Sequence, residues 1–93
     1  MPKLIVKTFW SYDSGGSNIQ ISLVKDIELL FKGRVVFEYI NVEENKEEAE
    51  KYNVKILPSV ILVYDDKERE RFIGLAQDLF LKKAIKKALS EIK

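Results

Sequence analysis

The sequence contains no cysteine and no histidine among its 93 residues. Their absence excludes disulfide bonds, catalysis by thiolate or imidazole, and the usual ligands of zinc and haem, so we expect no metal and no cofactor. No apolar run approaches the roughly 20 residues of a membrane span, and the N-terminus lacks the apolar stretch of a signal peptide. We therefore expect a cytoplasmic protein without a membrane-bound part.

An excess of charge of one sign is also missing, because 16 Lys and Arg stand against 15 Asp and Glu. A net charge of +1 creates no field that would attract the chain to nucleic acid or to an anionic lipid surface. The hydrophobic fraction of 46% is enough for one packed core, so residues 1–93 are expected to form a single, monomeric domain. The charged fraction of 33% is typical of proteins from thermophiles.

Hydrophobic periodicity predicts seven elements in the order β-α-β-α-β-β-α. Leu4–Trp10 is a nearly unbroken apolar run, which is typical of a central strand buried on both faces. From about Ser17 to Lys32 an apolar stripe recurs every three to four residues, and Gly33 follows where such a helix would end. The stripe consists of Ile19, Leu23, Val24, Ile27, Leu30 and Phe31.

The middle of the chain predicts a second strand and a short helix. Val35–Val42 alternates in the manner of a half-buried strand. Asn45 and Glu48 have the spacing of a capping box and would begin a charged helix. The inward side chains of this helix would be Ala49 and Tyr52.

The last third of the chain predicts a hairpin and a helix. Ser59–Tyr64 is a buried strand that begins directly after a proline, and a tight turn at 65–67 leads to Glu68–Ile73, which alternates charge as an edge strand does. From about Asp78 an amphipathic helix follows. Its inward residues would be Leu81, Ile85, Ala88, Leu89 and Ile92. A parallel crossover followed by a hairpin gives an α/β protein with a four-stranded mixed sheet and helices on both faces.

This order resembles the minimal thioredoxin fold, and several motifs agree with it. Phe9-Trp10 ends the first strand, and Ser14-Gly15-Gly16-Ser17 follows where the thioredoxin and glutaredoxin family carries its Cys-x-x-Cys motif. Ile56-Leu57-Pro58-Ser59 resembles the family's cis-proline segment. Phe72-Ile73-Gly74 resembles its closing strand and glycine, and Glu38–Val42 is similar to the second strand of small archaeal thioredoxin- and glutaredoxin-like proteins.

The resemblance implies a thiol-disulfide oxidoreductase that acts on protein disulfides or on small disulfides such as that of glutathione. In that chemistry the first sulfur, at a helix N-terminus, has a lowered pKa and attacks the substrate, and the second resolves the mixed disulfide. Ser14 and Ser17 would occupy these two catalytic positions, where hydroxyls cannot do this work, so the chain is expected to be inactive as written. The substrate would lie in a groove rimmed by Trp10, Tyr12, Gly15, Gly16, Leu57, Pro58 and Gly74.

Several explanations of the serines stay open. Both cysteines of a parent protein could have been replaced by their nearest isostere, or the chain could be a natural peptide-binding or structural module that has lost its thiols. A further reading needs no function, because Ser14 could be only a helix N-cap and Gly15-Gly16 only a tight turn. The two glycines could also hold an anion, with glutathione-like ligands as the best case.

The sequence also departs from the larger thioredoxins at the positions that move protons. Their buried Asp and Lys fall at Thr8 and Tyr39, their aromatic residue before the motif falls at Asp13, and their proline within it falls at Gly16. These differences resemble the small glutaredoxin-like branch. At the rim of the groove we expect Trp10 to be mostly buried and Tyr12 to be exposed.

Overall fold

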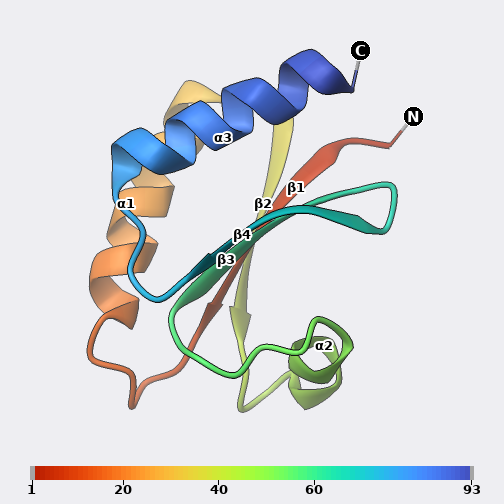
Figure 1. The fold of residues 1–93 in the computed structure, drawn as a ribbon. Helices are drawn as coiled ribbons and strands as arrows, with labels where there is room; N and C mark the ends of the chain where they lie inside the picture. Colours follow the sequence, from red (N-terminus) through yellow and green to blue (C-terminus); the bar gives the residue numbers. More distant parts are fainter. Residues whose placement is uncertain (1, 93) are drawn as a thin grey trace.

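The computed structural model describes residues 2–92 and contains the seven elements in the predicted order (Figure 1). The strands are β1 (Leu4–Trp10), β2 (Val35–Asn41), β3 (Ser59–Tyr64) and β4 (Lys67–Ile73). The helices are α1 (Ser17–Leu30), α2 (Lys46–Lys51) and α3 (Asp78–Glu91). Three of the observed ends differ from the predicted ones by one or two residues. Helix α1 ends at Leu30 instead of Lys32, β2 ends at Asn41 instead of Val42, and β4 begins at Lys67 instead of Glu68.

The four strands form one mixed sheet in the order β2-β1-β3-β4. The two inner strands are β1 and β3, and β1 pairs in parallel with β2 and antiparallel with β3. The outer strand β4 pairs antiparallel with β3, so the predicted hairpin and the predicted edge position of residues 68–73 are confirmed. A parallel pair needs a crossover, and α1 supplies it.

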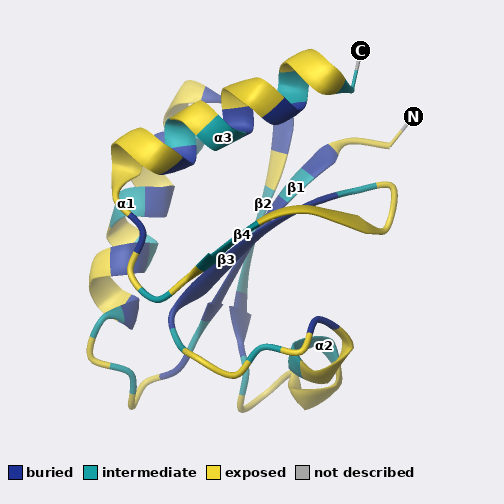
Figure 2. Ribbon diagram, in the orientation of Figure 1, coloured by how far each residue is buried: buried dark blue, intermediate teal, exposed yellow. Residues whose placement is uncertain are grey.

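Helices cover both faces of the sheet, with α1 and α3 on one face and α2 on the other (Figure 1). Residues of β3 alternate between the two cores that result: Val60 and Leu62 face α1 and α3, whereas Ile61 and Val63 face α2. Figure 2 shows β3 buried along nearly its whole length, as expected for an inner strand covered on both sides. No helix within residues 2–92 is long and apolar enough to cross a membrane.

The buried face of α1 differs from the predicted stripe. Ile19 and Leu30 are 55% and 58% exposed, so their predicted burial is wrong. Gln20 is fully buried in their place, because its side-chain amide donates to the carbonyl of Ala76 (3.1 Å) and its Oε1 accepts the Ala76 N–H (2.7 Å). A count of apolar residues misses a buried polar side chain that finds both of its partners in a distant loop. The buried residues of α1 are Ser17, Gln20, Val24 and Ile27.

The start of α2 also differs from the prediction. Asn45 is the N-cap residue, but its side chain makes no capping bond and instead donates to the carbonyl of Asn41 (3.0 Å). Glu48 is bonded to Lys7, so the predicted capping box is not formed. The inward position of Tyr52 is confirmed by its burial, and Ala49 packs against the same core.

Lys7 ties α2 to the sheet. Its side chain lies on the face of β1 that α2 covers, and its Nζ atom contacts Glu38 Oε1 of β2 (2.9 Å) and Glu48 Oε2 of α2 (2.5 Å). The Tyr52 ring centroid lies 5.3 Å from the same Nζ. Burial lowers the pKa of Lys7, but the bonds to the two carboxylates outweigh it and raise the pKa above its ordinary value.

Candidate functional site

The Ser14–Ser17 turn connects the end of β1 to the start of α1. The Ser14 N–H donates to the Ser11 carbonyl (3.2 Å), and the Ser17 N–H donates to the Ser14 carbonyl (3.1 Å), so two tight turns follow one another. The N-cap residue of α1 is Gly16, and no side chain caps the helix. Ser14 is therefore not the N-cap, and the reading that gave it only this role is wrong.

The two serines of the turn differ in their access to solvent. Ser17 is 1% exposed, and its Oγ accepts a hydrogen bond from the Ser11 N–H (3.3 Å). Ser14 is only half-buried. A reactive group at residue 14 can therefore be reached from outside, whereas a group at residue 17 can be reached only from within the turn.

Pro58 lies directly against this turn. The Leu57–Pro58 peptide bond is cis, the isomer that the family resemblance implies, and Pro58 is buried. A Cβ atom added to Gly16 would lie 3.2 Å from Pro58 Cδ, closer than an ordinary carbon contact. A Cβ atom on Gly15 would meet nothing within 4 Å. The absence of a side chain at Gly16 thus permits the close approach of two segments that are far apart in the sequence.

Hydrogen bonds hold the segment around Pro58 in place. The Gly74 N–H donates to the Pro58 carbonyl (2.9 Å), and the Ser59 hydroxyl donates to the Ile56 carbonyl (2.6 Å). Gly74 has a φ of +82°, a conformation that favours glycine. Within residues 2–92 no hydrogen bond involves the backbone N–H or carbonyl of Leu57.

Trp10 and Tyr12 form an aromatic pair beside the turn. Their ring centroids are 4.9 Å apart and their planes make an angle of 82°. Tyr12 is 79% exposed, as predicted. Trp10 is covered over most of its surface, as predicted, and its buried Nε1 has no partner within residues 2–92.

The structure thus connects some of the predicted groove residues. Gly16, Pro58 and Gly74 form one series of contacts, and Trp10 and Tyr12 form a separate pair. No hydrogen bond or ring contact joins the two groups within residues 2–92. Leu57 is half-buried and packs against the core beneath α2, and Gly15 is exposed.

Neither residue at the proton-moving positions of larger thioredoxins supplies a proton at neutral pH. Thr8 is fully buried, and its hydroxyl has no partner within residues 2–92. Tyr39 donates its phenolic proton to Glu28 Oε1 (2.6 Å), and burial, together with this bond, raises the pKa of Tyr39. The site therefore lacks a buried acid and base.

Ser11 is a structural residue of the site that the sequence reasoning missed. The Ser11 N–H donates to Ser17 Oγ. The Ser11 hydroxyl accepts a hydrogen bond from the Asp13 N–H (3.2 Å) and donates one to Glu43 Oε1 (3.3 Å). Gln20, also missed, ties α1 to the loop that follows Gly74. The signal for Gln20 was present, because it stands four and seven residues before two buried positions of α1.

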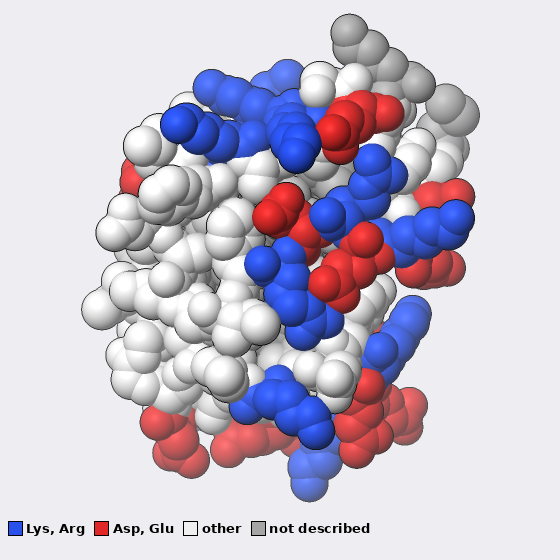
Figure 3. Space-filling view, in the orientation of Figure 1, with Lys and Arg blue, Asp and Glu red and all other residues white. Residues whose placement is uncertain are grey.

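One part of the molecular surface carries little charge. In the view of Figure 3, Lys, Arg, Asp and Glu gather over β4 and α3, whereas the left part of the molecule shows mostly uncharged side chains. Within residues 2–92 no group of three or more acidic side chains is placed to hold a metal ion. Asp13, next to Ser14, is exposed, so a molecule that approaches the turn meets an acidic side chain beside this mostly uncharged surface.

Comparison with known sequences identifies relatives. The sequence model of the Thioredoxin family matches residues 4–87. A thioredoxin H-type of Fagopyrum esculentum is 31% identical over 81 residues, which are 87% of this chain and 69% of the plant protein. A thioredoxin of Rickettsia typhi is 24% identical over 85 residues, covering 91% of this chain and 81% of that one.

Solved structures agree in fold. Thioredoxin-2, described as a component of the malaria parasite protein secretion machinery, matches with a TM-score of 0.87 and 22% identity over 92% of this chain and 84% of that one. The germline-specific thioredoxin Deadhead of Drosophila melanogaster matches with a TM-score of 0.78 and 21% identity over 98% and 82% of the two chains. At this level of identity the likeness shows the fold alone. Because the family model matches residues 4–87 of its 93 residues, the chain belongs to the thioredoxin family.

Proposed function

We propose that this chain is a protein disulfide oxidoreductase of the thioredoxin type in an inactive form, with engineered serines in place of both catalytic cysteines. One observation carries the proposal: the reachable Ser14 and the buried Ser17 stand three residues apart in a turn whose Gly16 lies against Pro58. The two positions differ in access in the way that an attacking and a resolving thiol must differ. A turn with no function would not need this arrangement.

With sulfur at both positions, the exchange would follow from the geometry. A thiolate at residue 14 attacks one sulfur of the substrate disulfide, and the other substrate sulfur leaves and takes up a proton. The thiol at residue 17 then loses its proton and attacks the mixed disulfide, which releases the second substrate thiol and joins residues 14 and 17. The substrate gains two electrons and two protons, and an external dithiol such as dithiothreitol restores the protein. A serine hydroxyl forms no such bond.

The substrate in this proposal is an extended polypeptide that carries a disulfide. The N–H and carbonyl of Leu57 have no hydrogen bond within residues 2–92 and can pair with such a chain as an added strand, and the mostly uncharged surface at the left of Figure 3 accepts apolar side chains. A small disulfide such as that of glutathione needs only the turn itself.

The finer features of the proposal rest on the sequence. The absence of a buried acid and base at Thr8 and Tyr39 favours the small, glutaredoxin-like branch known from archaea over the larger thioredoxins. We propose a monomer that acts in the cytoplasm. The alternative is a natural module of the same fold that binds peptides at Leu57 without chemistry, and it predicts no exchange even when thiols are supplied.

The test is reduction of insulin by dithiothreitol, comparing the present chain with Ser14→Cys/Ser17→Cys. We expect the double variant to accelerate the reduction and the present chain to give only the background rate. Circular dichroism would establish that both are folded. A folded double variant without activity would contradict the oxidoreductase proposal and favour the binding module.

A further inference from the structure

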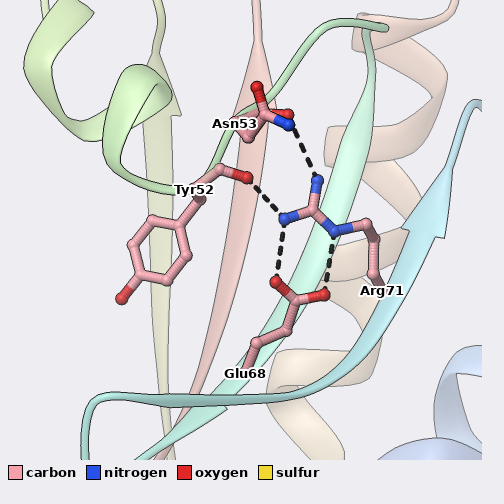
Figure 4. A network of polar contacts seen from close by, with 4 residues as sticks. All are labelled: Tyr52, Asn53, Glu68 and Arg71. Carbon is pink, nitrogen blue, oxygen red and sulfur yellow. Dashed lines mark hydrogen bonds and ion pairs between the residues drawn. The ribbon is translucent and has the colours of Figure 1, made fainter.

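The guanidinium of Arg71 bridges β4 to the end of α2 (Figure 4). Its Nε and Nη2 atoms donate to the two carboxylate oxygens of Glu68 (2.9 and 2.8 Å). The same Nη2 donates to the carbonyl of Tyr52 (2.5 Å), and Nη1 donates to the carbonyl of Asn53 (3.5 Å). One planar group thus holds a carboxylate on one side and two backbone carbonyls on the other.

A β-bulge in β4 makes this arrangement possible. In a regular strand, residues three apart point to opposite faces of the sheet. Here Val63 pairs with Glu68 and the next residue, Leu62, pairs with Glu70, so Arg69 is an extra residue in the ladder. Glu68 and Arg71 consequently lie on the same face, the one that α2 covers.

The two carbonyls that Arg71 holds stand at the start of the segment that leads to Pro58. Asn53 follows the C-cap residue of α2, Tyr52, and has the left-handed conformation (φ 53°). The Asn53 N–H donates to the Glu50 carbonyl (3.0 Å), and the Val54 N–H donates to the Ala49 carbonyl (2.9 Å). This is a Schellman motif, which leaves the carbonyls of Tyr52 and Asn53 without helical partners. Arg71 therefore fixes one end of residues 54–57, and the Gly74–Pro58 bond fixes the other.

We propose that Arg71, oriented by Glu68, is a positioning residue that sets the backbone of Leu57 for pairing with a polypeptide substrate. The proposal rests on the proposed disulfide exchange and adds a determinant of substrate class to it. The catalytic turn lies outside the contacts of Arg71, so the effect should be confined to substrates that pair with the loop. A small disulfide that needs only residue 14 should be indifferent to Arg71.

The experiment uses Arg71→Met in the Ser14→Cys/Ser17→Cys background, with Arg69→Met as the matched control. Arg69 lies on the same strand and also pairs with a carboxylate, Glu91 on α3 (3.4 Å), but it does not contact residues 52–57. We expect Arg71→Met to lower kcat/KM for insulin about fivefold to tenfold, mainly through KM, because a misplaced binding segment costs binding of the chain rather than the exchange step. The rate with 5,5′-dithiobis(2-nitrobenzoic acid) should stay unchanged, and Arg69→Met should change neither.

Two results of the activity assays would overturn the proposal. Equal losses with insulin and with the small disulfide would indicate general damage to the fold, and no loss with insulin would show that Arg71 does not position the loop. Amide hydrogen exchange in the serine-containing chain supplies a reading that does not depend on catalysis. Arg71→Met should accelerate hydrogen exchange of the Val54 and Gly74 amides severalfold, and Arg69→Met should not. Unchanged hydrogen exchange at both amides would overturn the proposal, even if the protein proved to have no disulfide-exchange activity.

Discussion

Exchanging Gly15 and Gly16 separately for alanine tests the contact between the turn and Pro58. Neither glycine has a positive φ, so alanine fits the backbone at both positions. Where alanine is tolerated it stabilises a protein by about 0.4–1 kcal/mol, because it restricts the unfolded chain. Gly15→Ala places its methyl group in open space and should show this gain.

Gly16→Ala should lose stability instead. Its methyl carbon would lie 3.2 Å from Pro58 Cδ and 3.7 Å from Cγ, whereas carbon atoms prefer about 3.5–4.0 Å, so one segment must move by a few tenths of an ångström. Pro58 is buried and its carbonyl is bonded to Gly74, which resists that movement. Overpacking of this kind costs about 1–3 kcal/mol, more than the gain from the unfolded chain. The gain from the unfolded chain is common to both variants, so Gly16→Ala should be less stable than Gly15→Ala by the cost of overpacking, about 1–3 kcal/mol.

Thermal unfolding followed by circular dichroism measures the difference. For a domain of this size, 1 kcal/mol corresponds to about 4–8 °C in Tm, so the Tm of Gly16→Ala should be lower than that of Gly15→Ala by at least about 4 °C. Urea unfolding with unchanged m values would show that the folded state is what has changed. If Gly16→Ala is as stable as Gly15→Ala, the turn does not press on Pro58 and the geometry described for the site is wrong.

Three further predictions concern buried polar groups. Lys7→Met should destabilise the chain by about 2 kcal/mol in urea unfolding, because Glu38 and Glu48 would face each other without a cation. Burial lowers the pKa of Lys7, but the bonds of Lys7 to Glu48 and Glu38 outweigh burial, so the pKa is raised in the folded protein. The stabilising effect of Lys7 is therefore complete below the pKa of the unfolded chain and is lost as the pH rises through the pKa of the folded chain. The difference in unfolding free energy between the chain and Lys7→Met should consequently narrow above about pH 10.5, and a constant difference would contradict this. Gln20→Ala should cost about 3 kcal/mol in the same assay, because it leaves the N–H and carbonyl of Ala76 unpaired beside a cavity; a loss below about 1 kcal/mol would show that the bridge contributes little.

The order of the helices and strands could be predicted because each of them has a pattern of apolar and charged residues within its own segment of the sequence. The unbroken apolar run at residues 4–10 predicts an inner strand, and the alternating charges at residues 68–73 predict an edge strand; both are confirmed. The inward positions of Leu81 and Ile85 on α3 are confirmed for the same reason, since a period of 3.6 residues fixes which face of a helix is buried. These features depend only on neighbouring residues and on the need to bury apolar surface.

The features that sequence could not supply depend on partners far along the chain. Spacing can place Gln20 on the buried face of α1, but it cannot identify Ala76, 56 residues later, as the partner of its side chain. The Asn45 side chain likewise donates to the carbonyl of Asn41 rather than capping its own helix. Alternation along β4 would place Glu68 and Arg71 on opposite faces, and only the bulge brings them together. The spacing of Ser14 and Ser17 located the candidate site, but their different burial arises from how the turn packs.

The central claim is that residue 14 is the attacking position of a disulfide-exchange site and residue 17 the resolving one. It is tested most directly by the rates at which the single variants Ser14→Cys and Ser17→Cys form mixed disulfides with glutathione disulfide, followed by mass spectrometry. Ser14 is partly exposed and stands two residues before Gly16, the N-cap of α1, whereas Ser17 is 1% exposed. A helix N-terminus lowers a thiol pKa and burial slows access, so Ser14→Cys should react faster by on the order of 100-fold. Equal rates, or faster reaction of Ser17→Cys, would contradict the claim.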